Sequence, residues 1–276
     1  MTAWKLLGIT CIVAPLTASA SIFFTDFELD AVGATTAAGQ VGGFFADRPG
    51  GIVRDSSTVA PFGPDNQYLE FSGVNSRAIV SAATVSDFAG ALVEVSVDFF
   101  DAGTGTAGFG TRFGLGTGGD PDTMDLNDDG SLFSIRFRTS DQTVNIDANT
   151  SVVSGSIGGY SVETAYRVQY IFNLTSEDQV VSTLDGNSVS LEPMQAAFGM
   201  QELATGNFSN IAVLASSGTV NTHIGLVFRN FSGDETIAYY DNLSVIPEPT
   251  TYAAIFGLAA LSLLLVRRRL SARADR

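Results

Sequence analysis

The amino-acid sequence predicts an all-β protein, an antiparallel β-sandwich flanked by an N-terminal signal peptide and a single C-terminal transmembrane helix. Three observations predict this class. Apolar and polar residues alternate with period two through the middle of the chain, which is the pattern of half-buried strands. Gly, at 29 residues, and many Ser, Asp and Asn residues fill the connections between these runs, as the turns of antiparallel sheets require. The long apolar stretches lie at the two ends.

The N-terminus has the three parts of a secretory signal peptide. Lys5 supplies a positive charge, residues 6–16 are apolar, and Ala18 and Ala20 form a small-residue cleavage motif. We therefore expect residues 1–20 to be removed by a cut after Ala20. An uncleaved anchor is the alternative, although the apolar run is short for a membrane span.

The folded body, residues 21–245, is long enough for one large sandwich and is strongly acidic. It holds 27 Asp and Glu against 8 Arg and no Lys. Such a charge repels nucleic acid and anionic lipid headgroups, so neither is an expected partner of the body. It keeps an exported domain soluble and can attract divalent cations. The sole cysteine, Cys11, lies in the leader, so the body forms no internal disulfide.

The strands are predicted from their alternation. Residues 92–100 place three valines and a phenylalanine on one face and polar residues on the other. A hairpin is expected at 180–189, because an Asp-Gly pair supplies the positive φ of a tight turn. Residues 193–203 are the best helix candidate in the body. Further strands are predicted at 68–72, 112–115, 133–138, 166–174, 223–229 and 237–245.

Four segments of the body resemble the concanavalin-A-like jelly roll, which is related to the laminin-G-like sandwich. They are residues 24–28 (FTDFE), 67–71 (QYLEF), 185–187 (DGN) and 240–245 (YDNLSV). The resemblance rests on strand rhythm, and it implies two facing antiparallel sheets of a kind often seen on exported bacterial surface proteins. A generic β-sandwich is the alternative.

The C-terminus has a proline-bounded break and then an apolar segment. Pro247, Glu248 and Pro249 end the preceding strand, because proline fixes φ and cannot donate to a strand ladder. Residues 250–266 are apolar and compatible with a helix. At 1.5 Å per residue they span about 25 Å, which is the lower limit for a membrane crossing.

Three arginines, Arg267, Arg268 and Arg269, follow the apolar segment directly. By the positive-inside rule they stay in the cytoplasm, which places the acidic body outside the inner membrane. The order of motif, apolar helix and arginine cluster in residues 246–269 resembles the PEP-CTERM sorting domain of Gram-negative bacteria. An ordinary C-terminal tail anchor is the alternative. Residues 270–276 form a cytoplasmic tail slightly longer than the usual end of that domain.

This resemblance implies a route and a partner. An exosortase, which is a multi-spanning membrane cysteine protease, would recognise Pro247, Glu248 and Pro249 and cleave nearby. The body would then pass from a single-pass inner-membrane intermediate to the cell envelope, the cell surface or the extracellular matrix. Proteins with this signal accompany exopolysaccharide production, so an extracellular polysaccharide is a further expected partner.

One acidic loop motif points to a metal. Asp125, Asn127 and Asp129, followed by Gly130, fit the first half of the D-x-[DN]-x-[DN]-G calcium loop. Carboxylates spaced two residues apart on a tight turn can converge on one calcium ion. The twelfth position is Arg136, where an EF-hand has its bidentate glutamate, so the motif is not an EF-hand. An acidic turn between strands is the alternative.

Catalytic constellations are weak, and the sequence predicts a protein that is not an enzyme. His223, the only histidine, lies at the start of a predicted strand and is expected to be structural. Glu94 and Asp98 share a strand face but stand about 13 Å apart at roughly 3.3 Å per residue, which exceeds the spacing of a glycosidase pair. The laminarinase-type hydrolases that share the expected fold carry E-x-D-x-x-E on one strand, and this sequence has no such run.

We therefore expect a non-enzymatic exported surface protein associated with the cell envelope or the exopolysaccharide matrix. The alternative is a calcium-assisted, lectin-like carbohydrate-binding module on the same export route. Such modules stack aromatic rings on sugar faces, and the only tryptophan lies in the leader. Tyr68, Tyr160, Tyr239 or Tyr240 would have to supply that ring, or these tyrosines pack at the edge of the sandwich.

Overall fold

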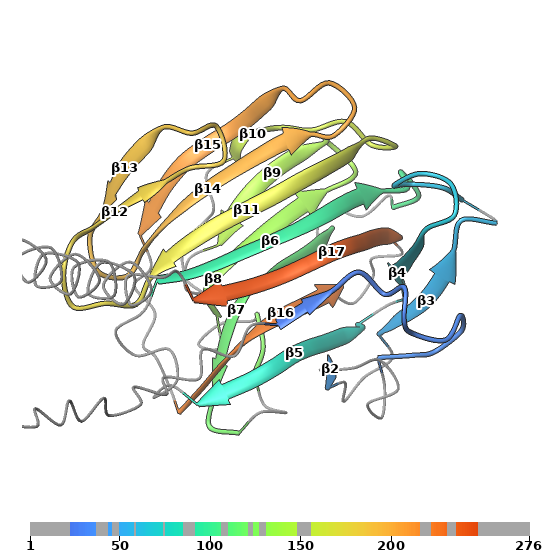
Figure 1. Cartoon of the computed structure of the whole chain (residues 1–276), viewed down its shortest axis with the longest axis horizontal. Helices are drawn as coiled ribbons and strands as arrows, with labels where there is room; N and C mark the ends of the chain where they lie inside the picture. The colour runs from blue at the N-terminus through green and yellow to red at the C-terminus, as the bar shows by residue number, and fades with distance from the viewer. Residues whose placement is uncertain are drawn as a thin grey trace, which may run out of the picture.

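The computed structural model shows two antiparallel β-sheets packed face to face, with a short hairpin beside one of them (Figure 1). The structure describes residues 23–36, 44–45, 50–57, 59–73, 75–84, 92–105, 110–120, 124–126, 131–147, 156–215, 222–230 and 236–247. The predicted all-β class is confirmed. Among these residues no helix is long and apolar enough to cross a membrane. The expected signal peptide, residues 1–20, and the expected membrane span, residues 250–266, lie outside the described residues.

Sheet A has eight strands, and its order is β15-β14-β11-β6-β17-β4-β3, with β1 added beside β17. β6 and β17 run side by side through its middle (Figure 1). The strand bounds are β1 Phe23–Thr25, β3 Gly51–Asp55, β4 Gln67–Phe71, β6 Leu92–Asp101, β11 Ala165–Asn173, β14 Gln195–Glu202, β15 Phe208–Ala215 and β17 Ala238–Pro247.

Sheet B has seven strands in the order β10-β9-β8-β7-β16-β5-β2. The strand bounds are β2 Phe44–Phe45, β5 Arg77–Thr84, β7 Thr111–Gly118, β8 Ser131–Arg138, β9 Thr143–Asp147, β10 Ser156–Gly159 and β16 His223–Asn230. The order mixes strands that are distant in the sequence, so the chain crosses repeatedly between the two sheets, as a jelly roll does.

The core lies between the sheets and is built by the predicted alternation. Every second residue of β6 from Val93 to Phe99 is fully buried. The Phe99 ring stacks on Phe137 of β8 with ring centroids 4.1 Å apart, and Phe113 of β7 stacks on Phe137 in turn. Burying each such side chain stabilises the fold by roughly 1.5 to 3 kcal/mol. Aromatic contact between the sheets therefore holds the sandwich together.

The predicted hairpin is confirmed as β12 (Gln179–Ser182) and β13 (Ser188–Leu191). Its turn contains Gly186 at φ 81°, and the Asp185 carboxylate accepts hydrogen bonds from the Thr183 hydroxyl and the Asn187 amide. Buried side chains join the hairpin to the outer face of sheet A. They are Leu92, Ile171, Val181, Leu191 and Ala197.

The predicted helix at residues 193–203 is wrong, because this segment forms β14. Ala196, Phe198 and Met200 of β14 belong to the main core, whereas Ala197 lies in the hairpin cluster. A strand that is covered on both faces carries no polar and apolar alternation. Burial on both sides therefore removed the sequence signal that identifies a half-buried strand.

Other strand predictions differ from the structure in extent. The alternation does not reveal β1, β2, β3, β5, β9, β10 or β15. β17 continues to Pro247, two residues beyond its predicted end, and pairs Pro247 with Val93 of β6. Proline donates no ladder hydrogen bond, which is consistent with the strand ending at this residue.

Candidate functional site

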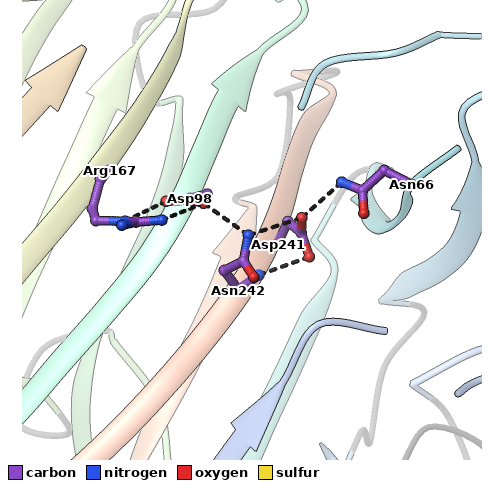
Figure 2. Close-up of polar contacts among 5 residues, drawn as sticks. All are labelled: Asn66, Asp98, Arg167, Asp241 and Asn242. Carbon is purple, nitrogen blue, oxygen red and sulfur yellow. Dashed lines mark hydrogen bonds and ion pairs between the residues drawn. The ribbon is translucent and has the colours of Figure 1, made fainter. Parts of the chain in front are cut away.

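A group of interacting polar side chains lies on the outer face of sheet A, the face turned away from the core (Figure 2). The register places Asp98 of β6 directly opposite Arg167 of β11 on one side and Asp241 of β17 on the other. Directly opposite residues in an antiparallel pair share a sheet face. We call this group, with the amides that join it, the polar cluster: Asn66, Asp98, Arg167, Asp241 and Asn242.

A bulge in β17 completes the cluster. The pairing of β17 with β6 shifts between Asp241 and Ser244, and Asn242 adopts φ 48°. Asparagine tolerates this left-handed conformation better than most residues. As a result the Asn242 amide donates to both carboxylates, at 2.9 Å to Asp98 Oδ2 and 3.1 Å to Asp241 Oδ2. Leu243 and Val245 then return to the core.

Asp98 and Arg167 form a two-pronged ion pair. Arg167 Nε donates to Asp98 Oδ1 at 2.8 Å, and Arg167 Nη2 donates to Asp98 Oδ2 at 2.9 Å. The Asp98 side chain is 3% exposed, whereas that of Arg167 is 41% exposed. Hydrogen bonding to Asp98 is the largest cause that raises the pKa of Arg167. The pair therefore fixes a guanidinium at the surface over a buried carboxylate.

Asp241 is the group with the most perturbed acidity in the cluster. Burial raises the pKa of Asp241 to about 6, against the lowering effect of its hydrogen bonds. Asn66 Nδ2 donates to Asp241 Oδ2 at 2.8 Å, and the Asn242 backbone N–H donates to Oδ1 at 2.7 Å. Nearby negative charge on Asp98 and Glu28 adds to the rise of this pKa.

A polar hollow of about 470 Å³ lies next to the cluster, and Asn66 belongs to both. Its lining is Glu28, Asp55, Ser56, Ser57, Ala60, Pro64, Asp65, Asn66 and Gln67. The Glu28 carboxylate accepts from the Gln67 backbone N–H at 2.8 Å, and the Asp55 carboxylate accepts from the Ser57 backbone N–H at 3.2 Å. The hollow therefore offers carboxylate, amide and hydroxyl groups to a ligand rich in hydroxyls.

Asp125 of the predicted calcium loop lies against sheet B and contacts two arginines. Its Oδ2 accepts a hydrogen bond from Arg229 and lies 3.5 Å from Arg77 Nη1. Asn127 and Asp129 lie outside the described residues. Among the residues that are described, no group of three or more His, Cys, Asp or Glu side chains could hold a metal ion.

These contacts do not fit Asp125 as a calcium ligand. Both arginine side chains are at most 6% exposed, so a calcium ion at this carboxylate would displace their counter-charge in a desolvated setting. The same ion would also face two buried positive charges. Calcium binding by the loop stays a prediction, and the surroundings of Asp125 disfavour it.

The tyrosines considered for sugar stacking are buried. Tyr68, Tyr160, Tyr239 and Tyr240 are each at most 6% exposed. The Tyr160 hydroxyl donates to the Asp101 carboxylate, and the Tyr240 hydroxyl lies 2.8 Å from that of Thr111. They are therefore packing residues, in agreement with the second of the two roles predicted for them.

The remaining residues singled out in the sequence are His223 and the residues of the sorting and cleavage signals. His223 begins β16 as expected, and its Nδ1 lies 3.0 Å from the Gly119 carbonyl oxygen. Pro247 ends β17. The other predicted sorting and cleavage residues lie outside the described residues: Glu248, Pro249, Arg267, Arg268, Arg269, Ala18 and Ala20.

No protein-family model matches the sequence, and no curated protein matches it. Solved lectin structures share the fold. The lectin from Bauhinia forficata in complex with GalNAc is 9% identical, and the match covers 83% of this chain and 99% of the lectin with a TM-score of 0.51. Lectin I-B4 from Griffonia simplicifolia in its metal-free form is 11% identical. The match covers 82% of this chain and 99% of the lectin with a TM-score of 0.50.

Lectin UEA-II complexed with galactose gives a similar match at 11% identity. The match covers 82% of this chain and 97% of the lectin with a TM-score of 0.50. Likeness at these identities defines the fold. The chain therefore has the concanavalin-A-like β-sandwich fold, in agreement with the resemblance found in its sequence.

Sequence reasoning did not identify the polar cluster. It assigned Asp98 to a polar strand face, and it included Asp241 and Asn242 in a segment typical of the fold. The one usable signal is an asparagine inside an otherwise regular strand, because asparagine is favoured where a bulge needs a left-handed residue. The pairing of Asp98 with Arg167 depends on strand order, which local alternation does not contain.

Proposed function

We propose that this chain is an exported, non-enzymatic carbohydrate-binding protein of the cell surface or the exopolysaccharide matrix. The observation that carries the proposal is the two-sheet fold shared with lectins, two of which were solved with galactose and GalNAc. An acidic body between an apolar leader and a C-terminal sorting signal supports an extracytoplasmic location.

The polar cluster and its hollow are the proposed sugar site. Sugar hydroxyls both donate and accept, so a site that recognises them without ring stacking needs fixed groups of both kinds. Arg167 and Asn66 present N–H donors, and the hollow adds the Glu28 and Asp55 carboxylates. Buried Asp98 and Asp241 hold those donors in place through the hydrogen bonds in Figure 2. Neighbouring side chains therefore pre-organise the site.

The same contacts support a non-enzymatic role. A hydrolase of glycosidic bonds needs one carboxyl group to donate a proton and another that is free to act as base or nucleophile. Asp98 accepts from Arg167 and Asn242, and Asp241 accepts from Asn66 and Asn242. Each carboxylate is thus occupied by donors of its own chain, which suits positioning better than proton transfer.

Binding to immobilised neutral polysaccharides tests the proposal, with the full chain kept in a non-ionic detergent. We expect the wild type to bind at least one polymer and Asn66→Ala to weaken that binding by about tenfold, because one hydrogen-bond donor of the site is lost. Asn187→Ala is the matched control, because Asn187 is an exposed amide in the hairpin turn. Absence of binding to every polysaccharide tested would refute the carbohydrate-binding role.

The export route is the second part of the proposal. Exosortase recognition of Pro247, Glu248 and Pro249 would follow arrest of residues 250–266 in the inner membrane, held by Arg267 to Arg269. The intact mass of the protein recovered from cells reports both expected cuts at once. Changing the three arginines to glutamine should leave the C-terminal segment uncut or misplace the body. Unchanged trimming and location would contradict this route.

A further inference from the structure

A row of five residues crosses the outer face of sheet A, one on each of five adjacent strands. Phe208 of β15 is paired with Gln201 of β14, Gln201 with Arg167 of β11, Arg167 with Asp98 of β6, and Asp98 with Asp241 of β17. We call these residues the cross-strand row. Directly opposite residues share a sheet face, so the row joins Phe208 to the polar cluster (Figure 2).

Phe208 places an aromatic ring on the surface at one end of the row. The next residue, Ser209, lies opposite Met200 of the core. Because successive side chains of a strand point to opposite faces, Phe208 points outward. It is 44% exposed, whereas the four tyrosines considered for sugar stacking are each at most 6% exposed. Phe208 therefore offers the accessible ring that those tyrosines do not.

A tight turn holds this end of the row in place. The Glu202 backbone N–H donates to the Asn207 carbonyl oxygen at 2.9 Å, and the Gly206 N–H donates to the Glu202 carbonyl oxygen at 2.8 Å. Gln201 Nε2 also donates to the Gly206 carbonyl oxygen, at 3.2 Å. Phe208 follows this turn directly. The ring and the Gln201 amide are thus positioned before a ligand arrives, which lowers the entropy lost on binding.

The hairpin of β12 and β13 leaves the cross-strand row open and covers a neighbouring row. Val213 of β15 is 45% exposed, and its row continues through Ala197 of β14 and Ile171 of β11. Both of these residues are buried against the hairpin. In the cross-strand row the residue of β11 is instead Arg167, whose side chain is 41% exposed. A long ligand can therefore cross the sheet from Phe208, whereas the hairpin blocks the same path from Val213.

The dimensions of the row exceed one sugar ring. With strands about 4.8 Å apart, the four strand spacings between Phe208 and Asp241 amount to roughly 19 Å. The groups next to the ring are the Gln201 amide and the Arg167 guanidinium, which make hydrogen bonds. A ring followed by such groups suits a ligand whose units each have an apolar face and several hydroxyls. The row therefore points to a chain of sugars.

We propose that Phe208 is a second sugar subsite, where the ring stacks on one unit of a linear polysaccharide while Arg167 and Asn66 bind hydroxyls of other units. This inference rests on the proposed carbohydrate-binding function and names its ligand class as an extended neutral chain lying across the strands of sheet A. Residues 203–222 contain no charged residue, so the surface around the ring offers no ionic partner to a charged polymer. The acidic body repels anionic chains.

The test measures binding of the full chain, in a non-ionic detergent, to dextran, galactomannan and arabinoxylan. We expect wild-type protein to bind at least one of them and Phe208→Ala to weaken that binding by about fivefold, because the stacking contact is lost. Fragments of increasing length, cut from the polymer that binds, report the span of the site. Wild-type affinity should rise with fragment length, whereas Phe208→Ala should bind long fragments little better than short ones.

Matched variants separate ring stacking from apolar contact. Val213→Ala is the control, because Val213 is an equally exposed apolar residue of the same strand, and it should bind like wild type. Phe208→Tyr keeps the ring and should keep the affinity, whereas Phe208→Leu keeps an apolar side chain without a ring and should bind weakly. Circular dichroism and the melting temperature confirm that each variant is folded. The tyrosine and leucine pair still decides the question if Phe208→Ala does not fold.

Several outcomes would overturn the inference. Binding that Asn66→Ala weakens and Phe208→Ala leaves unchanged would remove the second subsite while the proposed function stands. An equal loss in Val213→Ala would show a general effect of exposed apolar residues. A dimer that Phe208→Ala dissociates, seen by chemical cross-linking with polymer binding unchanged, would assign the ring to a contact between two copies. Absence of wild-type binding to all three polymers would count against the proposed function itself, and the inference would fall with it.

Discussion

Charged side chains are arranged differently on the outer faces of the two sheets. On sheet A each carboxylate of the polar cluster accepts hydrogen bonds from cationic or amide groups, as Asp98 does from Arg167 and Asn242. On sheet B four arginines lie opposite one another, and the Asp125 carboxylate contacts two of them, Arg77 and Arg229. The opposite charges of Asp98 and Arg167 neutralise each other within the fold. At Asp125 one carboxylate contacts two guanidinium groups instead of one, and this contrast directs the predictions below.

The largest effect is expected at Asp125, whose carboxylate contacts two buried arginines of sheet B. Asp125→Ala should lower the free energy of unfolding by about 3 to 5 kcal/mol, because it leaves two buried arginines without that counter-charge. The loss should fall toward the lower value, since Arg77 also donates to the Met124 carbonyl oxygen at 2.7 Å. Urea unfolding of the full chain measures it.

The double variant Asp125→Ala with Arg77→Met is the internal check on that prediction. Removing one of the two arginines should restore part of the stability, because less buried charge is left uncompensated. Asp178→Ala, at an exposed position, serves as the control. If Asp125→Ala were no more destabilising than Asp178→Ala, the buried ion contacts of sheet B would have no energetic role.

A smaller effect is expected on sheet A. Asp98→Ala should lower the free energy of unfolding by about 2 to 3 kcal/mol. The loss is smaller than for Asp125→Ala because the partner Arg167 is 41% exposed and can be hydrated. Glu70→Ala is the comparison, since it breaks an ion pair with Arg54 whose side chain is 44% exposed, and it should cost less than about 1 kcal/mol. Equal losses in urea unfolding would mean that burial of Asp98 does not set the strength of its contacts.

Alternation in the sequence was sufficient for the fold class but not for the sites. It located β6, β8 and β11 because their polar residues face solvent or one another on an outer sheet face. It failed at β14, where both faces are covered. Arg112 and Arg136 were recognisable as outward-facing strand residues. Their alignment with Arg229 and Arg77 follows from the order β8-β7-β16-β5. Arg77 and Arg229 are paired although they are more than 140 residues apart in the chain.

Asp241 provides a pH-dependent test of the polar cluster. Its pKa is about 6 in the folded protein, against an ordinary value of 3.8 for aspartate, mainly because of burial. The folded protein therefore keeps a proton on Asp241 at pH values where the unfolded chain has released it. Asp241 stabilises the fold less as the pH rises from about 4 to about 6. Asp241→Asn should remove this contribution to the pH dependence of stability.

Unfolding in urea at pH 4.5 and at pH 7 separates Asp241 from the other carboxylates. Compared with wild type, Asp241→Asn should gain stability, or lose less of it, when the pH is raised from 4.5 to 7. Asp185→Asn is the control with the opposite sign, because hydrogen bonds in the hairpin turn lower the pKa of Asp185. A pH profile identical to that of wild type would show that Asp241 is not desolvated as described.

Calcium should have the smallest effect, and the reason again lies in sheet B. A divalent ion at Asp125 would have to compete with Arg77 and Arg229 for one carboxylate, with both arginines too buried to move into water. We therefore expect no saturable heat when calcium is titrated into chelator-treated full chain, and no change in melting temperature. A saturable signal that Asn127→Ala and Asp129→Ala abolish would restore the calcium loop. It would also require the loop to bind the ion with oxygens other than those of Asp125, because Arg77 and Arg229 already contact that carboxylate.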